Sequence, residues 1–361
     1  MKIGILTFHW ATNYGAVLQC YALQTFLESK GHDVVVINYK PQQYDDNLYS
    51  FIMFRKFLNI PDYLNNRKKE FALSNFRDQY LKLTERVYCC QEIPNVVSDF
   101  DIIFSGSDQV LNPTFLLSGE RRGVVSPAYF LGFPFKGKRI GYALSFGCVD
   151  YPQVANEIAK DYIKQFDVIS VRENTGVSIV RAMGRNDAFV APDPSLLMSS
   201  TFYQNLADQA LTKIHHESVY CFFIRHLQQR KSLIGELIQN ERLLWNNDDN
   251  DYTLQGWLFK IKVAKFVVTD SFHCVVMCLK FHKPFVVVTE AEGNVGMNDR
   301  LYTLLGQCQL TNRILSKSKL KNINLISNTD INWNDIDMML NINVEKNTEF
   351  LNCILNEDFT N

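Results

Sequence analysis

The 361-residue sequence lacks the features that would indicate a nucleic-acid-binding protein or a membrane-spanning one. Its 37 basic and 38 acidic residues give a formal net charge of -1, whereas nucleic-acid-binding domains usually carry an excess of positive charge on one face. No apolar stretch is long enough to cross a bilayer. We therefore expect no nucleic acid among the partners and no membrane span.

The nine cysteines do not form a metal-binding pattern. No Cys-x-x-Cys pair occurs, and Cys89 and Cys90 are adjacent, which is a poor arrangement for metal ligands. Others, such as Cys221 and Cys274, stand inside apolar runs, and buried free thiols are typical of a reducing compartment. The chain opens on a strand pattern rather than on the apolar run of a signal peptide. We expect a cytoplasmic protein with no metal and no bound cofactor.

What the sequence does contain is the material for a large apolar core. Hydrophobic residues make up 47% and aromatic residues 13% of the chain, so a well-packed globular protein is expected. A length of 361 residues exceeds that of one ordinary core, and two domains are the default expectation.

Strand and helix patterns alternate in both halves of the chain. A strand at 3–7, an amphipathic helix at 19–30 and a second strand at 34–38 form a βαβ unit, which favours a parallel sheet. Further strands are predicted at 101–104, 139–144, 168–171, 219–224, 266–268 and 284–288. The predicted fold class is α/β, with two Rossmann-like domains.

The predicted organisation has three parts. Residues 1–165 form an N-terminal domain, into which a helical insertion is placed at about 41–95. Residues 166–332 form a second domain. A helical tail at 333–361 is expected to pack back on the first domain. The aromatic and basic insertion is interpreted as a packed helix with a solvated rim, with contact to lipid or glycan left open.

The most informative segment is the predicted strand-to-helix junction Thr269-Asp270-Ser271-Phe272-His273. Asp270 or Ser271 is a good N-cap, which places His273 in the first helical turn. Free backbone N–H groups and the helix dipole favour an anion there. An imidazole in this turn would hydrogen-bond an anion and exchange a proton with it, so the segment predicts an anion site with acid–base chemistry.

Other polar groups follow predicted strands and are expected at the same kind of sheet edge. In open parallel sheets, ligands bind beyond the carboxyl ends of the strands. The segments that this rule selects are Asn13-Tyr14-Gly15, Ser107-Asp108-Gln109, Arg172-Glu173, Asp193 and Ser271-Phe272-His273.

These segments, in this order, resemble the polysaccharide pyruvyl transferase family over about residues 1–315. The resemblance rests on Asn13-Tyr14-Gly15-Ala16-x-Leu18-Gln19-x-Tyr21-Ala22-Leu23-Gln24, Gly106-Ser107-Asp108-Gln109-Val110, Ser170-Val171-Arg172-Glu173, Asp193-Pro194 and Thr269-Asp270-Ser271-Phe272-His273. It implies two Rossmann-like domains in the arrangement of GT-B glycosyltransferases, with a cleft between them. It also implies a ketal pyruvyltransferase, which moves the enolpyruvyl carbons of phosphoenolpyruvate onto a sugar and releases phosphate.

The reaction that the resemblance implies needs a general acid and a group that accepts the hydroxyl proton, and we assign these roles to individual residues. His273 would be the general acid, and Asp108 would act on the acceptor hydroxyls. The residues expected to bind phosphoenolpyruvate are Arg172, Ser271, Phe272, His273 and Arg300. The residues expected to bind the acceptor are Asn13, Tyr14, Gly15, Gln19, Asp108 and Gln109.

Position 271 departs from many relatives, which carry a donor-holding arginine there. The chain resembles the Ser-Phe-His subgroup, which bacterial capsule and exopolysaccharide gene clusters encode. Arg300 is the expected substitute cation. The implied acceptor is a glycan, linked to undecaprenyl diphosphate, at the inner face of the plasma membrane, where peripheral membrane contact is open.

Two other functions stay open, as do plainer roles for the chosen residues. A GT-B glycosyltransferase with a nucleotide-sugar donor would need a ribose-binding acid and a pyrophosphate-binding loop, and no Gly-rich loop is found in the second half. A non-catalytic glycan-binding relative is the other. His273 could cap a helix, Asp108 could be an N-cap, Asp193 could form a turn between two prolines, and Arg300 could be a surface arginine.

Overall fold

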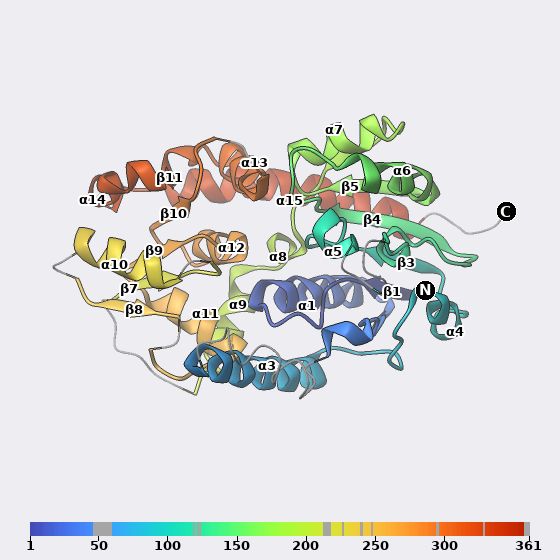
Figure 1. The fold of residues 1–361 in the computed structure, drawn as a ribbon, viewed down its shortest axis with the longest axis horizontal. Coiled ribbons are helices and arrows are strands. Elements are labelled where there is room, and N and C mark those ends of the chain that lie inside the picture. Colours follow the sequence, from blue (N-terminus) through green and yellow to red (C-terminus); the bar gives the residue numbers. More distant parts are fainter. Residues whose placement is uncertain are drawn as a thin grey trace. The chain divides into compact units, whose positions relative to one another are not determined.

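The computed structural model describes residues 1–45, 60–117, 120, 124–211, 218–225, 227–238, 241–246, 248–293, 296–327 and 329–356. Two compact units are present, and each contains one parallel sheet (Figure 1). The first consists of Met1–Val190 and Tyr252–Leu254, and the second of Ala191–Asp251 and Gln255–Asn361. The predicted α/β class is confirmed. None of the described helices has the length and apolar character needed to cross a membrane.

The sheet of the first unit has the strand order β2-β1-β3-β4-β5-β6, and all its strand pairs are parallel. Its strands are β1 (Lys2–Leu6), β2 (Asp33–Val36), β3 (Ile102–Ser105), β4 (Lys138–Leu144), β5 (Val168–Val171) and β6 (Phe189–Val190). The chain leaves β1 toward β2 and returns to the other side of β1 as β3. The strand order therefore reverses between β1 and β3, which is where ligands bind in sheets of this kind.

Helices and short 3-10 turns connect these strands. They are α1 (Tyr14–Ser29), η1 (Gln42–Tyr44), α3 (Ile60–Tyr80), η2 (Cys90–Glu92), α4 (Ile93–Val96), α5 (Pro113–Leu117), η3 (Ala128–Phe130), α6 (Gln153–Tyr162), η4 (Ile163–Gln165) and α7 (Asn174–Ala182). α1 begins where the Asn13 side chain accepts hydrogen bonds from two backbone N–H groups, and it ends before Gly31, whose φ is +86°.

The predicted insertion contains a real helix. α3 packs against α1, with the rings of Tyr21 and Phe76 5.5 Å apart. Residues 46–59, which include Tyr49, Phe51, Phe54, Arg55, Lys56 and Phe57, lie outside the described part of the chain.

The sheet of the second unit has the order β11-β10-β9-β7-β8 and is also parallel throughout. Its strands are β7 (Val219–Phe222), β8 (Leu243–Trp245), β9 (Phe266–Thr269), β10 (Phe285–Thr289) and β11 (Ile314–Ser316). The strand order reverses between β7 and β9. Every residue of β9 and β10 is buried, as expected for strands covered on both faces.

The helices and 3-10 turns of the second half follow the same alternation. They are α8 (Pro194–Leu197), α9 (Ser200–Ala207), α10 (Leu227–Leu237), α11 (Leu254–Val263), α12 (Phe272–Lys280), η5 (Gly296–Asn298), α13 (Asp299–Gln307), η6 (Thr311–Arg313), η7 (Lys317–Asn322), α14 (Ile323–Ser327) and α15 (Trp333–Asn356).

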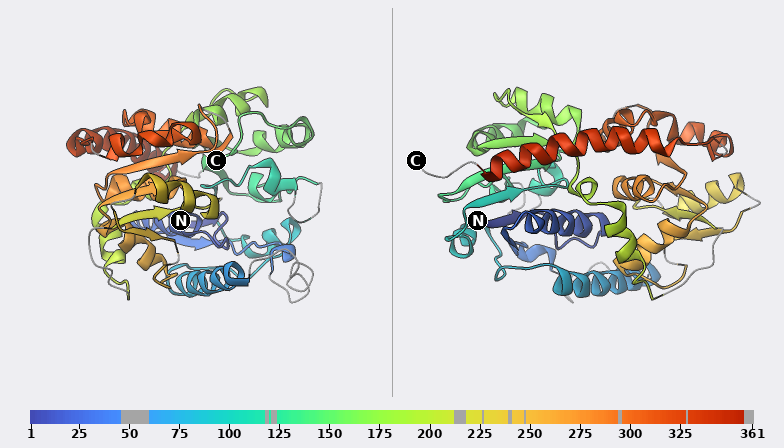
Figure 2. Two further views of the ribbon diagram at one scale, coloured as in Figure 1. Left: turned by 60° about the vertical axis from the view of Figure 1, so that its left-hand side comes forward. Right: turned by 180° about the vertical axis from the view of Figure 1, so that it is seen from behind.

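The division between the units comes later in the chain than the sequence predicts. It falls between Val190 and Ala191 rather than after residue 165, because β5 and β6 extend the first sheet beyond β4. The C-terminal tail forms α15, which the right-hand view of Figure 2 shows as a continuous helix. It contacts α8 within the second unit, and its packing on the first domain stays a prediction.

Candidate functional site

In the first unit, the motif after β1 meets the motif after β3 at the point where the strand order reverses. The Thr7 hydroxyl donates to the Ser107 carbonyl (3.1 Å), and the Gln19 amide donates to the Thr7 hydroxyl (3.0 Å). Gln19 is fully buried, and its amide nitrogen also donates to the Ala16 carbonyl (2.9 Å). Gln19, predicted to bind acceptor, therefore connects α1 to the two strand ends.

The segment Asn13-Tyr14-Gly15 is the start of α1 rather than a tight turn. Asn13 Oδ1 accepts from the Gly15 N–H (2.9 Å) and the Ala16 N–H (3.4 Å). The Tyr14 hydroxyl donates to the Tyr252 carbonyl (2.9 Å). These contacts give the predicted acceptor-binding residues Asn13, Tyr14 and Gly15 a structural role at the carboxyl end of β1.

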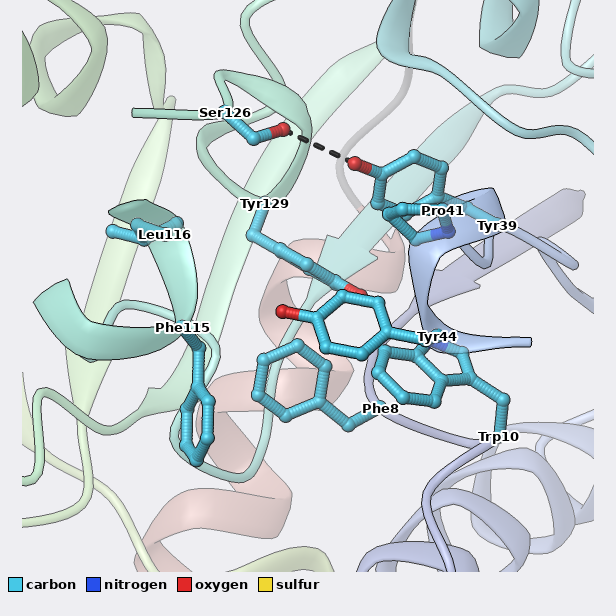
Figure 3. Close-up of a pocket in the computed structure, with 9 residues that line it drawn as sticks. All are labelled: Phe8, Trp10, Tyr39, Pro41, Tyr44, Phe115, Leu116, Ser126 and Tyr129. Carbon is cyan, nitrogen blue, oxygen red and sulfur yellow. Dashed lines mark hydrogen bonds between the residues drawn. The ribbon is translucent and has the colours of Figure 1, made fainter. Parts of the chain in front are cut away.

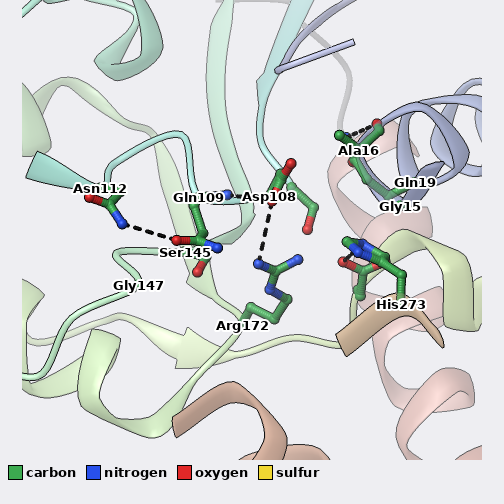
Figure 4. A network of polar contacts seen from close by, with 12 residues as sticks. Gly15, Ala16, Gln19, Asp108, Gln109, Asn112, Ser145, Gly147, Arg172 and His273 are labelled. Carbon is green, nitrogen blue, oxygen red and sulfur yellow. Dashed lines mark hydrogen bonds and ion pairs between the residues drawn. The ribbon is translucent and has the colours of Figure 1, made fainter. Parts of the chain in front are cut away.

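Arg172 and Asp108 come together in the same unit, beyond the ends of β5 and β3 (Figure 4). Arg172 Nη2 lies 3.8 Å from Asp108 Oδ1, and the Arg172 side chain is almost fully buried. Asp108 has a left-handed backbone (φ 67°) and accepts from the Gln109 N–H (2.8 Å). Asp108 is not a helix N-cap, because the next helix, α5, begins at Pro113.

The residues that follow Asp108 and Arg172 in the chain are themselves held by polar contacts. Gln109 Oε1 accepts from the Asn112 side chain (3.0 Å). Glu173 is buried and accepts from the Ser145 hydroxyl (3.0 Å) and from the Phe146 N–H (2.7 Å). Burial raises the pKa of Glu173, against the lowering effects of Arg172 and of these hydrogen bonds. The chain next to both Arg172 and Asp108 is therefore fixed by polar contacts.

In the second unit, His273 lies in the first turn of α12, as predicted. Ser271 is the N-cap: its hydroxyl accepts from the Cys274 N–H (3.3 Å), and its own N–H donates to Thr269 Oγ1 (3.0 Å). Because Ser271 caps the helix, the His273 imidazole is left for another role. The imidazole is buried, and its Nε2 lies 3.4 Å from Asp193 Oδ2.

Asp193, which the sequence selects at a strand end but also allows as a plain turn former, is a functional candidate. It does cap α8, since Oδ1 accepts from the Ser195 N–H (2.9 Å) and the Ser195 hydroxyl (2.6 Å). Its other oxygen faces His273. A fully buried carboxylate at this distance attracts a protonated imidazole by its charge, which is the role that a carboxylate has in other acid–base sites. Nothing in the local sequence pattern connects the two segments, because the fold alone brings them together.

A second feature of this unit is a cavity of about 200 Å³ at the reversal point between β7 and β9. It is lined by residues after three strand ends and at the start of α13, among them Ile224, Arg225, Asp270, Thr289, Glu290 and Arg300. Arg300 is only 9% exposed, so the alternative of a surface arginine is wrong. Its guanidinium lies 5.7 Å from the centre of the Phe272 ring, and that ring lies 5.3 Å from the His273 ring.

Arg225 and Arg230 belong to the same cavity, and neither was predicted from the sequence. Arg230 donates to Glu290 (2.7 Å) and lies 3.7 Å from Asp270 Oδ2. Asp270 also accepts from the backbone N–H groups of Ile224 (2.8 Å) and Arg225 (3.2 Å), which joins the ends of β9 and β7. Burial raises the pKa of Asp270, whereas these donors and Arg230 lower it.

The first unit also contains an aromatic cluster, which is too tightly packed to hold a substrate (Figure 3). The space between its rings is about 10 Å³, close to the minimum for one water molecule. The lining side chains are Phe8, Trp10, Tyr39, Pro41, Tyr44, Phe115, Leu116, Ser126 and Tyr129. Among the residues that the structure describes, no group of histidine, cysteine and acidic side chains is arranged to hold a metal ion.

Comparison with known families shows which family the chain belongs to. The family model for polysaccharide pyruvyl transferase matches residues 13–292, which include the first-unit motifs, Arg172, Asp193 and His273. The chain belongs to the polysaccharide pyruvyl transferase family. Membership assigns it to transferases that act on polysaccharide. The comparison with curated proteins found no match.

Solved structures show that the fold of this family member is of the GT-B type. A Listeria monocytogenes protein assigned as a UDP-N-acetylglucosamine 2-epimerase matches with a TM-score of 0.52 at 11% identity, over 94% of this chain and 90% of that one. The UDP-N-acetylglucosamine 2-epimerase of Rickettsia bellii matches with a TM-score of 0.50 at 9% identity, over 99% and 96%. At these identities the likeness concerns the fold, which agrees with two Rossmann-like domains.

Proposed function

We propose that the protein is a ketal pyruvyltransferase. It transfers pyruvate from phosphoenolpyruvate to a sugar residue of a polysaccharide repeat unit, forms a cyclic pyruvate ketal and releases phosphate. The observation that carries this proposal is the buried His273–Asp193 pair at the start of α12, in a chain that the pyruvyl transferase model matches from residue 13 to residue 292.

In this proposal His273 is the general acid. Its Nε2 faces Asp193, so Nδ1 is the nitrogen that serves the donor. The Nδ1 proton goes to the methylene carbon of phosphoenolpyruvate, and positive charge develops on the adjacent carbon. One sugar hydroxyl adds to that carbon and loses its proton. A second hydroxyl then displaces phosphate and closes the ketal, and its proton goes to solvent or to a carboxylate.

The other proposed roles follow from charge and burial. Arg172 is a buried guanidinium that suits an anionic donor, and Asp108 is the carboxylate proposed to act on the acceptor hydroxyls. Ser271, Phe272 and Arg300 complete the proposed donor side, since the N–H groups at the start of α12 favour an anion. Asn13, Tyr14, Gly15, Gln19 and Gln109 are proposed as the acceptor side, through the backbone and side-chain atoms that their structural contacts leave available.

The proposed acceptor is a glycan on undecaprenyl diphosphate in a bacterial capsule or exopolysaccharide pathway. Such an acceptor would place the reaction at the cytoplasmic face of the plasma membrane, with peripheral membrane contact. No metal or bound cofactor enters the proposed chemistry.

A glycosyltransferase with a nucleotide-sugar donor is the alternative that shares this fold. Such a donor is usually held by a glycine-rich turn at a helix start and by an acid that binds the ribose. Here Phe272 and His273, rather than glycines, occupy the helix start, where a pyrophosphate would need close approach to the backbone. These features favour the small donor phosphoenolpyruvate.

A thermal-shift comparison separates the two donors. We expect phosphoenolpyruvate to raise the melting temperature of the full chain and a panel of nucleotide sugars to leave it unchanged. Stabilisation by a nucleotide sugar and not by phosphoenolpyruvate would contradict the proposal. Mass spectrometry of lipid-linked oligosaccharides incubated with the protein and phosphoenolpyruvate then identifies the acceptor by its gain of a pyruvate ketal.

A further inference from the structure

The cavity between β7 and β9 is placed and charged as a site for a small anion. It lies at the reversal point of the second sheet, beyond the carboxyl ends of three strands, where open parallel sheets bind their ligands. Its volume of about 200 Å³ is below the range of about 300–1,000 Å³ that drug-sized ligands occupy. The occupant is therefore expected to be small.

The charges around the cavity leave one cation in excess. Three guanidinium groups, those of Arg225, Arg230 and Arg300, face two carboxylates, those of Asp270 and Glu290. Both carboxylates neighbour Arg230, which also donates to the Val288 carbonyl (3.2 Å). Arg230 is therefore held as part of the wall, and its charge is compensated.

Arg225 differs from Arg230 in both exposure and partners. Its side chain is exposed, and its guanidinium donates to the thioether of Met297 (2.9 Å), which is a weak acceptor. Within the described part of the chain, no carboxylate forms an ion pair with it. Arg225 does lower the pKa of Asp270 by its charge, but its hydrogen-bonding fork is engaged only with this thioether in the described residues. A guanidinium of this kind on the wall of a cavity is a ready partner for a phosphate or carboxylate, which its planar fork binds through two parallel hydrogen bonds.

Arg300 connects this cavity to the proposed acid. Its guanidinium lies 5.7 Å from the centre of the Phe272 ring, and the centre of that ring lies 5.3 Å from the centre of the His273 ring. Asp270, which lines the cavity, directly precedes Ser271, the N-cap of α12, so the cavity adjoins the segment that leads into this helix. The Asp270 carboxylate, at the end of β9, accepts from the Ile224 and Arg225 N–H groups, which follow β7. This contact holds together the two strand ends that lead to Arg225 and to His273.

We propose that Arg225, together with Arg300, binds an anionic group of phosphoenolpyruvate in this cavity, while Arg230 positions the wall through Asp270 and Glu290. The inference rests on the proposed function and adds Arg225 as a donor-binding residue. It also supplies arginines that can hold the donor, because position 271, at the start of α12, is a serine and brings no cation.

Titration calorimetry of the full chain with phosphoenolpyruvate tests this assignment. Arg225→Gln should weaken binding by about 10- to 100-fold, because a charge-assisted hydrogen-bonded pair is lost, and Arg225→Lys should retain part of the affinity. Arg242→Gln is the matched control, since Arg242 is an exposed arginine just before β8, at the opposite end of the same sheet. The control should bind as the unmodified protein does.

The outcomes distinguish this inference from the proposed function. If the unmodified protein binds phosphoenolpyruvate and Arg225→Gln binds it equally well, the assignment of Arg225 is overturned and the function stands. If the unmodified protein does not bind phosphoenolpyruvate, the proposed function fails, and the inference falls with it.

A measurement on the unmodified protein covers the case in which a variant does not fold. Phenylglyoxal modifies accessible guanidinium groups, and peptide mapping locates each modified arginine. Phosphoenolpyruvate should protect Arg225 and leave Arg242 reactive, and inorganic phosphate should protect Arg225 at higher concentration. Equal modification of Arg225 with and without phosphoenolpyruvate would overturn the inference.

Discussion

At the scale of single residues, the proposed chemistry depends on the buried contact between His273 and Asp193. Nε2 and Oδ2 are 3.4 Å apart, and the other oxygen of Asp193 is held by Ser195. The same unit contains a comparable pair on its surface, in which His282 Nε2 lies 3.0 Å from the Asp337 carboxylate. The surface pair provides a control for what a histidine–aspartate contact does without a buried site.

His273→Ala should lower the rate of phosphate release from phosphoenolpyruvate by about 10²–10⁴-fold in the presence of acceptor, because the proton donor is removed. His282→Ala should have the rate of the unmodified protein. A coupled phosphate assay measures both. A rate for His273→Ala within a few-fold of the control would show that another group delivers the proton.

Asp193→Asn should lower kcat by at least about tenfold with a smaller change in KM. The amide oxygen still accepts from the Ser195 N–H, so the cap of α8 is retained while the charge beside His273 is lost. Steady-state kinetics, with a thermal melt as a check on folding, measure the effect. A variant that melts early but turns over normally when folded would assign Asp193 a structural role alone.

His9 predicts how stability depends on pH. This imidazole is buried after β1, between the Thr7 carbonyl (3.2 Å) and Asn38 (3.1 Å), and burial lowers its pKa to about 4 against the raising effect of these hydrogen bonds. The pKa is lower in the folded chain than in the unfolded one. Its contribution to stability is therefore present above pH 6.5 and is lost as the pH falls toward 4.

The loss should be on the order of 3 kcal/mol for His9 alone. Urea denaturation at a series of pH values measures it, and His9→Gln should flatten the profile between pH 6.5 and 4. An unchanged profile in the variant would mean that other groups, such as buried carboxylates, set the acid limit.

At the scale of elements, local chemistry decides where the two motif-bearing helices begin. The sequence correctly placed the start of α12, because Ser271 is a strong capping residue directly after an apolar strand. It placed the start of the first helix too late, at Gln19, because an aromatic and a glycine at positions 14 and 15 resembled a loop. Asn13, which accepts from two N–H groups, begins α1 earlier.

Asn13→Ala should destabilise the protein by about 1 kcal/mol, since two N–H groups of α1 lose their acceptor. Asn13→Ser should cost much less, because serine also caps helices. Chemical denaturation of both variants measures the difference. Equal losses would show that Asn13 contributes through something other than the cap.

At the scale of the whole molecule, the sequence predicted the α/β class and the existence of two sheets, but not which strands belong to each sheet. The patterns at β5 and β6 do not distinguish a strand that ends one sheet from a strand that begins another. Pairing decides this, and Gly141 of β4 is aligned with Ile169 of β5. For the same reason Arg225 and Arg230 were not recognised as site residues, and the contact of Asp193 with His273 was not foreseen, because their neighbours come from distant segments.

The assignment of residues Tyr252–Leu254 to the first unit leads to a prediction about the whole chain. The Tyr252 hydroxyl donates to Asn65 Oδ1 (2.6 Å) on α3, and the ammonium of Lys68 lies 5.6 Å from the centre of the Tyr252 ring. Tyr252→Phe should lower the free energy of unfolding by about 0.5–1.5 kcal/mol through the lost hydrogen bond. Thermal and urea melts of the full chain would show whether it does.

Because Tyr252–Leu254 belong to the first unit, they also determine how the protein can be divided into fragments. A fragment that ends at Val190 would contain every strand of the first sheet, yet the Tyr14 hydroxyl would lose the Tyr252 carbonyl and Asn65 would lose its phenol donor. A single cut therefore cannot produce a complete first half. A recombinant first domain would need residues 252–254 supplied as a grafted peptide, or would need to be expressed alongside the remainder of the polypeptide.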